Sequence, residues 1–248
     1  MISIVMACYK NFKTTKNAVI SVLNYTDDID FELILVNDGA DRQLNKYFKT
    51  LMKYNKNIKL ITNKQNVGWV KSINQGIAVS EGKYVMFLNN DIEVLPQYSN
   101  WLKEMMACMK DDVGAVAPVS NFVLGWQNIK YNGKFVNYTH YSKFLIGMCM
   151  LVKRKVIDEI GGLDERFGLG GNDDLDYSIR IRLAGYKLVI TRKTFIQHKG
   201  FQSLGKIYKD YDEVEALTRP KLVLKWGAEM VNDLFSIDNN FIYKGLEA

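Results

Sequence analysis

The sequence of 248 residues has few of the features that define small or membrane-bound protein classes. Its three cysteines, Cys8, Cys108 and Cys149, form no Cys-x-x-Cys pair, which argues against a disulfide framework and a zinc site. We expect reduced thiols in a cytoplasmic compartment, with Cys8 and Cys149 as small core residues. No apolar run approaches the roughly 18 residues that span a bilayer. The apolar N-terminus has no basic lead-in and predicts a first strand, not a signal peptide.

Two nucleotide-binding signatures are also absent. No Gly-x-Gly-x-x-Gly motif follows the first apolar run, which disfavours a dinucleotide-dependent dehydrogenase, and no Gly-x-x-x-x-Gly-Lys-Ser/Thr motif suggests a P-loop enzyme. The net charge is +6, from 33 basic and 27 acidic residues, but no block of five or six like charges occurs. We therefore expect a solvated surface and no nucleic-acid partner.

Strand and helix patterns alternate regularly in the first third of the chain. Strand candidates span residues 2–7, 31–36, 58–62 and 84–88, and helix candidates span residues 16–24, 41–54 and 69–79. Thr14 or Thr15 is a candidate cap for the first helix. This alternation predicts a parallel sheet with right-handed crossovers and helices on both faces. With three prolines and no low-complexity linker, the chain suits one large domain, or one domain with an appendage.

The pattern is less regular after residue 96. We expect a helix over 97–110, a short strand over 113–117, a long loop over 118–139 near the ligand edge, and a strand over 143–152. A glycine-rich loop over 161–171 precedes a helix that starts with acids and has Asn172 as a candidate cap. Short strands over 186–190 and 195–197, then helices over 206–217 and 219–226, complete the pattern, and the tail from residue 227 is weakly patterned.

Polar residues follow three of the four predicted parallel strands. They are Cys8-Tyr9, Asn37-Asp38-Gly39 and Asn89-Asn90-Asp91. Ligands of open α/β sheets bind beyond the carboxyl ends of the strands, so we expect these side chains to converge there. Asp91, and His198 after a later short strand, are plausible ligands of a divalent cation that also binds phosphate. The alternatives are a strand-ending turn at Asn89-Asn90-Asp91 and an ordinary polar role for His198.

Several motifs in order resemble those of the inverting glycosyltransferases of family 2, over about residues 2–200. The segments that carry the resemblance are Ile4-Val-Met-Ala-Cys-Tyr9, Val36-Asn-Asp38-Gly39, Asn66-Val-Gly68 with Asn74-Gln75-Gly76, Leu88-Asn-Asn-Asp91, Gly161-Gly-Leu-Asp164-Glu165, Asp173-Asp174-Leu-Asp176 and His198. Each motif is weak alone, but the ordered set with these spacings is specific. The chain departs from the family at Asn89, where the metal motif usually begins with Asp, and this lowers the negative charge of the site.

The resemblance implies an α/β fold of the GT-A type, a Rossmann-like, open and mostly parallel sheet flanked by helices with a C-terminal helical appendage. It divides the chain into a glycosyltransferase domain over 1–200 and a helical extension over 201–248 packed on it. Within the domain, residues 1–117 would form the nucleotide-sugar half and residues 118–200 the acceptor and catalytic half.

The same resemblance implies roles for individual residues. Asp91 and His198 would hold Mn2+ or Mg2+, Asp174 would be the general base, and Asp173 would orient substrate hydroxyls. The residues expected to bind the nucleotide sugar are Ala7, Tyr9, Asp38, Asn66, Gly68, Asn74, Asn89 and Asn90. Asp38 would accept a hydrogen bond from the N3–H of uracil or thymine. The residues expected near the acceptor are Trp126, Gly147 and Gly170, and Trp69 or Trp126 is a candidate for stacking on a sugar.

The implied activity is transfer of a sugar from a nucleoside diphosphate sugar, UDP in first place, to a hydroxyl of a glycan, lipid-linked or protein acceptor, with inversion. One alternative is a sugar-phosphate nucleotidyltransferase, although Cys8 to Asn11 lacks the glycines expected after the first strand. The other is a carbohydrate-binding or assembly module without turnover, which Asn89 keeps open. The basic and aromatic C-terminal part leaves open contact with the inner face of a membrane. Sugar, acceptor and oligomeric state are not identified.

Overall fold

The computed structural model describes residues 1–26, 29–129 and 139–236. The expected loop over 118–139 and the expected extension over 201–248 therefore contain residues that lie outside the described ones. One mixed sheet with strand order β3-β2-β1-β4-β8-β6-β9-β5 forms the centre, and β7 pairs with β9. Among the described residues no helix is long and apolar enough to cross a bilayer.

The first half of the sheet is parallel, as the alternation predicts. It consists of β1 (Ile2–Cys8), β2 (Phe31–Asp38), β3 (Ile58–Asn63) and β4 (Tyr84–Asn89), connected by α1 (Phe12–Asn24), α2 (Arg42–Tyr54) and α3 (Trp69–Val79). In register, Cys8 lies beside Asn37 and Ala7 beside Asn89. The three predicted polar strand ends therefore meet at one edge of the sheet.

The second half is mixed. Its strands are β5 (Ile92–Val94), β6 (Val113–Ser120), β7 (His140–Ser142), β8 (Cys149–Lys153) and β9 (Lys187–His198). Its helices are α4 (Trp101–Ala107), α5 (Arg154–Ile160), α6 (Asp173–Leu183), α7 (Tyr211–Trp226) and α8 (Ala228–Asp233). β8 is antiparallel to β4 and β6, whereas β9 runs parallel to β6.

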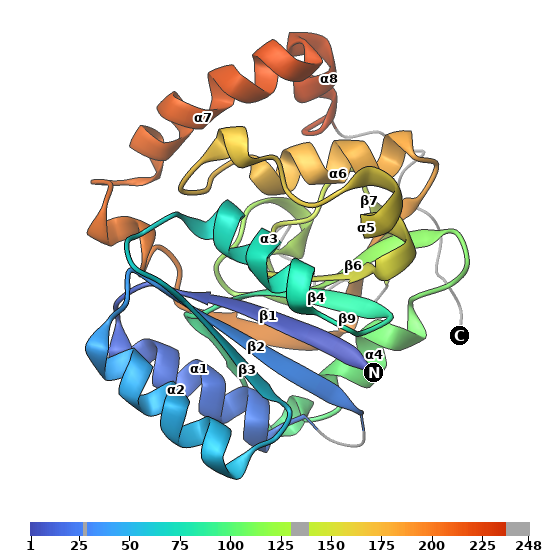
Figure 1. Ribbon diagram of the computed structural model, residues 1–248. Helices are drawn as coiled ribbons and strands as arrows, with labels where there is room; N and C mark the ends of the chain where they lie inside the picture. Colours follow the sequence, from blue (N-terminus) through green and yellow to red (C-terminus); the bar gives the residue numbers. More distant parts are fainter. Residues whose placement is uncertain (27–28, 130–138, 237–248) are drawn as a thin grey trace.

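Helices cover both faces of this sheet (Figure 1), and each face has its own apolar core. In β1, Val5 belongs to the core on the side of α3 and α6, and Ile4 and Met6 belong to the core on the side of α1 and α2. Because both faces are covered, β1 is buried along its whole length, as is usual for parallel strands. α7 and α8 lie outside α6 as a further layer (Figure 1).

Several expected boundaries were wrong. The N-cap of α1 is Asn11, with a left-handed backbone, and Thr15 is buried inside the helix. The expected strand over 143–152 starts only at Cys149, because preceding backbone N–H groups donate to side chains and not to a neighbouring strand: Leu145 N bonds Ser178 Oγ at 3.0 Å and Ile146 N bonds Gln127 Oε1 at 2.6 Å.

Three other elements differ in extent from the predictions. The helix expected over 97–110 is a short 3-10 turn, Pro96–Tyr98, followed by α4. The two strands expected over 186–190 and 195–197 form the single strand β9, whose pairing with β6 shifts register between Pro118 and Val119. The helices expected over 206–217 and 219–226 are one helix, α7, which contains Pro220. Long-range pairing decided the extent of β9, since local patterns carry no information about register.

Candidate active site

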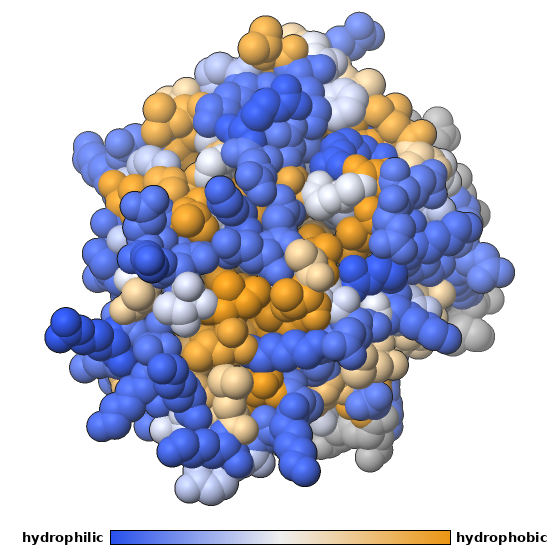
Figure 2. All heavy atoms as spheres, viewed as in Figure 1, coloured by the Kyte–Doolittle hydropathy of each residue, from blue (hydrophilic) through white to orange (hydrophobic). Residues whose placement is uncertain are grey.

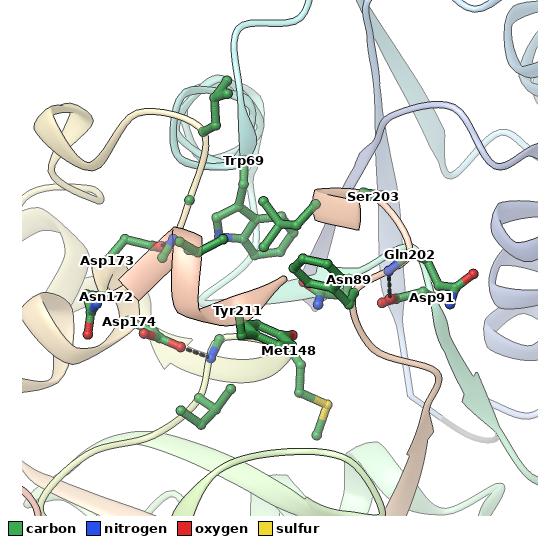
Figure 3. Close-up of a pocket in the computed structure, with 18 of the residues that line it drawn as sticks. Trp69, Asn89, Asp91, Met148, Asn172, Asp173, Asp174, Gln202, Ser203 and Tyr211 are labelled. Carbon is green, nitrogen blue, oxygen red and sulfur yellow. Dashed lines mark hydrogen bonds between the residues drawn. The ribbon is translucent and has the colours of Figure 1, made fainter. Parts of the chain in front are cut away.

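A cavity of about 530 Å3 opens at the carboxyl ends of β1, β2 and β4. The glycine-rich loop before α6, the start of α6, the segment after β9 and the start of α7 complete its walls. Figure 3 shows Asp173 and Asp174 on one side of it and Asn89 and Asp91 on the other. Its size is within the range of small-molecule sites, which is roughly 300–1,000 Å3.

Asp38, at the end of β2, fixes one wall of the cavity. Its Oδ1 accepts from the backbone N–H of Val67 at 2.9 Å, and its Oδ2 accepts from that of Gly68 at 3.0 Å. Gly68 has a φ of 91°, and a Cβ there would lie 2.7 Å from the carbonyl oxygen of Gly168. Glycine is therefore required, and Asp38 holds the loop in place.

Asp91 and His198 lie next to each other, because Asp91 directly precedes β5 and His198 ends β9, which pairs with β5. The Nδ1 of His198 is 2.7 Å from the carbonyl oxygen of Phe122, which can only accept, so Nδ1 carries the proton. Nε2 then faces Oδ1 of Asp91 at 3.1 Å and the side-chain amide of Asn89 at 3.3 Å. Oδ1 of Asp91 is buried and accepts no hydrogen bond among the described residues. Nε2 of His198, when it is unprotonated, and Oδ1 of Asp91 are both acceptors, so at 3.1 Å a proton or a cation must lie between them.

The electrostatics of this pair favour positive charge. Burial lowers the pKa of His198, but the carboxylate of Asp91 and the carbonyl of Phe122 outweigh it and raise the pKa above its ordinary value. Nε2 of His198, when it is unprotonated, and Oδ1 of Asp91 suit a divalent cation whose other positions go to phosphate oxygens or water. The Asn89 atom that faces Nε2 is its amide nitrogen, which is a donor and not a cation ligand. In the described part of the chain, no group of three or more His, Cys, Asp or Glu residues forms a fuller site.

A short segment after β9 covers the Asp91 side of the cavity. The backbone N–H of Gln202 points to Oδ2 of Asp91 at 3.4 Å, and Oγ of Ser203 donates to Oδ1 of Asn90 at 3.1 Å. The side chain of Asn11 donates to the carbonyl of Gln202 at 2.6 Å. The sequence carries no motif for this segment, since its contacts depend on the path of the chain.

Asp174, at the start of α6, faces the cavity with both oxygens held. Oδ2 accepts from the backbone N–H of Gly147 at 3.0 Å, and Oδ1 accepts from that of Leu175 at 2.9 Å. The side chain is partly exposed to the cavity, whereas the adjacent Asp173 is only 4% exposed. Burial raises the pKa of the Asp174 carboxyl, and that favours its acting as a proton acceptor near neutral pH.

Asp173 lies behind its neighbour. Its carboxylate accepts from the backbone N–H of Gly171 at 2.7 Å and from the indole of Trp69. Burial and the charge of Asp174 raise the pKa of Asp173 to about 7. Trp69 is thus engaged with Asp173, in addition to lining the cavity.

The third acid of the motif, Asp176, has a different place. It is fully buried, and its Oδ1 accepts from the indole N–H of Trp226 at 2.7 Å and lies 2.6 Å from Nζ of Lys225. Asn172 does not cap α6 with its side chain but donates to α7, at Thr218 Oγ1, at 2.9 Å. Both residues therefore hold α7 on α6.

α7 brings to the cavity a residue that the sequence analysis missed. Tyr211, its first residue, lies between Asp174 and Asp91 in Figure 3. Burial and the charges of Asp91 and Asp174 raise the pKa of Tyr211 to about 12, so the phenol stays protonated. The Tyr211 ring packs on Phe201 with centroids 4.6 Å apart. No sequence signal marks Tyr211, because it comes from an extension beyond the recognised motifs.

Most of the expected site residues line this cavity. They are Ala7, Tyr9, Asp38, Asn66, Gly68, Asn89, Asn90, Asp91, Gly147, Gly170, Asp173, Asp174 and His198. Asn74 and Trp126 are not among the lining residues. Asn74 instead bonds both backbone groups of Leu163, at 2.9 and 2.8 Å, and Trp126 packs against the core and against His140.

Comparison with known proteins identifies the family. Residues 3–161 match the family model described as glycosyl transferase family 2. The O-antigen biosynthesis protein RfbC of Myxococcus xanthus is 26% identical over 145 residues, which are 48% of this chain and 11% of that protein. The chain also spans only 26% and 33% of the length of two other curated relatives.

Two solved structures share the fold. GalNAc-T7 with UDP, GalNAc and Mn2+ aligns with a TM-score of 0.67 and 17% identity over 80% of this chain and 43% of that one. The mannosyltransferase PcManGT of Pyrobaculum calidifontis, in complex with GDP-Man and Mn2+, aligns with a TM-score of 0.65 and 13% identity over 94% and 73%. At these identities the likeness establishes the GT-A fold alone. Because the family model covers well over half of its residues, this chain belongs to glycosyl transferase family 2.

Proposed function

We propose that this chain transfers a sugar from a nucleoside diphosphate sugar, in first place a UDP sugar, to an acceptor hydroxyl with inversion at the anomeric carbon. One observation carries the proposal: Asp38, the pair Asp91 and His198, and Asp174 line a single cavity. A base-reading group, a site for the diphosphate and a proton acceptor are the three parts that this reaction needs.

At the donor end, Asp91 and His198 would hold a divalent cation, with the side chain of Asn89 beside them. When bound, Mn2+ or Mg2+ neutralises the charge of the leaving diphosphate. The carboxylate of Asp38 accepts from the N–H groups of Val67 and Gly68 and from the side-chain amide of Asn63, and its remaining lone pair can accept from a uracil N3–H.

At the acceptor end, Asp174 would take the proton of the attacking hydroxyl. The N–H groups of Gly147 and Leu175 fix its rotamer, so it needs no reorganisation when the acceptor binds. Asp174 and Asp91 lie on opposite sides of Tyr211 in Figure 3, which supports attack from the side opposite the diphosphate and hence inversion.

The proposed division of the chain follows from these positions. Residues 1–117 would bind the donor, and residues 118–200 would supply Asp174 and the acceptor side. His198 crosses this division, because β9 runs back beside β5 and ends next to Asp91. The helical extension from residue 201 adds Tyr211 to the same cavity.

The test is a thermal-shift screen of nucleotide sugars with and without Mn2+, followed by product analysis. A bound donor stabilises the folded state by mass action, so the matching nucleotide sugar should raise the melting temperature, and more so with Mn2+. Release of nucleoside diphosphate in the presence of an acceptor, with inverted configuration by NMR, would establish the reaction. A donor that binds without any nucleotide release would instead support a carbohydrate-binding module.

A further inference from the structure

The motif Asn74-Gln75-Gly76 connects to the donor side of the cavity through Gln75 and not through Asn74. Gln75 lies on α3, outside the cavity lining. Its Nε2 donates to Oδ1 of Asn63 at 3.0 Å, and its Oε1 accepts from Nδ2 of Asn63 at 2.9 Å. Two amides paired in this reciprocal way fix each other's orientation, because each offers its donor to the acceptor of the other. Gln75 therefore holds Asn63 with its NH2 group on a defined side.

Asn63 in turn contacts the residue proposed to read the base. It ends β3 and lies in register beside Asp38, the last residue of β2. Its Nδ2 donates to Oδ1 of Asp38 at 3.2 Å in addition to its bond with Gln75. If the Asn63 amide were reversed, its oxygen would face the carboxylate, so Asp38 and Gln75 favour the same orientation. We call this chain of three side chains, Gln75, Asn63 and Asp38, the amide bridge.

The packing of α3 on the sheet places the amide bridge. A Cβ at Gly76 would collide with the side chain of Val5 in β1, so glycine lets α3 lie close to the sheet. β3 is the edge strand on this side, and Figure 2 shows a mostly hydrophilic surface over α1 and α2 beside it. Asn63 and Gln75 are only half-buried at this edge, where water competes for an unpaired amide. The pairing with Gln75 therefore keeps Asn63 on Asp38.

The amide bridge decides how many acceptor positions Asp38 has left. A carboxylate offers about four lone pairs to hydrogen-bond donors. Oδ1 of Asp38 receives two donors, the N–H of Val67 and the side chain of Asn63, and Oδ2 receives the N–H of Gly68. One position, on Oδ2, remains for a ligand in the cavity.

One acceptor position suits some nucleotide bases better than others. Uracil and thymine present a single donor, N3–H, between two carbonyl oxygens. Guanine presents N1–H and an amino group side by side, so one acceptor leaves one of its donors unpaired, which costs affinity. Cytosine and adenine present a ring nitrogen that accepts, and a carboxylate repels it. Asn66, whose Oδ1 accepts from Gly68 N–H, lines the cavity and has its NH2 group to offer to a base carbonyl.

We infer that Asn63 and Gln75 are positioning residues of the donor site, which limit Asp38 to a base with a single N–H donor and so select uracil or thymine over guanine. Neither residue lines the cavity, so both act through Asp38 and do not touch the nucleotide. The inference rests on the proposed function, since it takes Asp38 as the residue that reads the base. Loss of the amide bridge frees a second acceptor position on Oδ1 and relaxes the selection.

The experiment titrates UDP and GDP, each with Mn2+, into the wild type, Gln75→Met, Asn63→Ala and the double variant by calorimetry. Methionine keeps the length of the glutamine side chain without its hydrogen bonds. The wild type should prefer UDP by more than tenfold, and each single variant should lower the UDP-to-GDP affinity ratio by about threefold to tenfold, the usual effect of one lost hydrogen bond. The double variant should stay within about twofold of Asn63→Ala, because Gln75 acts only through Asn63.

The matched control is Asn57→Ala, which removes an amide from the opposite end of β3. Asn57 donates to the carbonyl of Phe31 at 3.1 Å and lies outside the cavity lining, so its loss should leave the ratio unchanged. Thermal unfolding of each variant shows that the fold is retained. A general loosening of the fold would weaken both nucleotides alike, whereas loss of the amide bridge changes their ratio.

The inference is overturned if the wild type prefers GDP, if Gln75→Met keeps the wild-type ratio, if the effects of the two single variants add in the double variant, or if Asn57→Ala changes the ratio as much. A wild type that binds neither nucleotide rejects the proposed function together with the inference. UDP binding that none of the variants alters rejects the inference alone and leaves the proposed function standing.

Discussion

Replacing Asp174 by Asn tests the chemistry of the site with little change of shape. The carboxylate accepts from two backbone N–H groups, those of Gly147 and Leu175. An Asn side chain has one acceptor oxygen, so one N–H loses its partner at a cost of about 1–3 kcal/mol. Removal of a carboxylate whose charged form is disfavoured by burial offsets part of this cost. Since about 1 kcal/mol shifts the melting temperature of a domain this size by about 2–4 °C, Asp174→Asn should stay folded.

Turnover should respond far more strongly than stability. Loss of a general base slows reactions by about 100- to 10,000-fold, or about 3–5 kcal/mol of barrier. Donor affinity should stay within about threefold, because Asp174 lies on the side of the cavity opposite Asp91 and changes at separated sites rarely couple. Wild-type turnover should fall as the pH drops through the raised pKa of Asp174, because the base must be unprotonated, and the residual activity of the variant should lack this dependence.

The assay is nucleoside diphosphate release at saturating donor, with donor affinity measured by titration. The matched control is Asp212→Asn, which removes the same charge from an exposed position on the α7 wall of the cavity. It should change turnover by less than about threefold, because exposed charges interact weakly through water. The base assignment fails if Asp174→Asn keeps more than a tenth of wild-type turnover with an unchanged pH profile, or if Asp212→Asn loses as much.

Three further predictions concern the metal, the extension and pH. Asp91→Ala should abolish the Mn2+-dependent part of the nucleotide-sugar thermal shift, whereas Glu93→Ala, outside the cavity lining, should retain it. Trp226→Phe removes the indole N–H that donates to the buried carboxylate of Asp176 and leaves Lys225 as its partner, so it should lower the free energy of unfolding by about 1–3 kcal/mol in urea titrations; an unchanged midpoint would contradict this. Because the pKa of Asp173 is raised from its ordinary value to about 7, the folded protein binds more protons than the unfolded chain between about pH 4 and 7. Its free energy of unfolding should therefore fall as pH rises through that interval, and Asp173→Asn should flatten the fall.

The parallel half of the fold could be predicted because its signals are local. Each strand is a short apolar run that ends in polar residues, and α3 spans Trp69–Val79 as its pattern predicts. Because parallel strands have their carboxyl ends at one edge of the sheet, the ends of β1, β2 and β4 share that edge. The cavity positions of Asp38, Asp91 and Asp174 follow from that arrangement together with the family motifs.

The second half was less predictable because its order depends on distant partners. The segment before Cys149 is apolar enough for a strand, yet its N–H groups bind Ser178, Gln127 and Asp174 from other elements. Asn74 lies outside the cavity lining for a related reason. It belongs to a motif that suggests the nucleotide, but its amide satisfies the backbone of Leu163, a partner 89 residues away in the sequence.

The three acids at the start of α6 show how one motif can serve two purposes. A helix start needs one or two acidic groups, so three acids exceed what the helix dipole requires. Two of the acids, Asp173 and Asp174, do line the cavity, but Asp176 faces the other way and binds Trp226 and Lys225 of α7. The proposed base, Asp174, and the anchor of α7, Asp176, are thus two residues apart on one helix. Since α7 begins with Tyr211 in the cavity, the proposed base Asp174 and the α7 wall of the cavity are both held by α6.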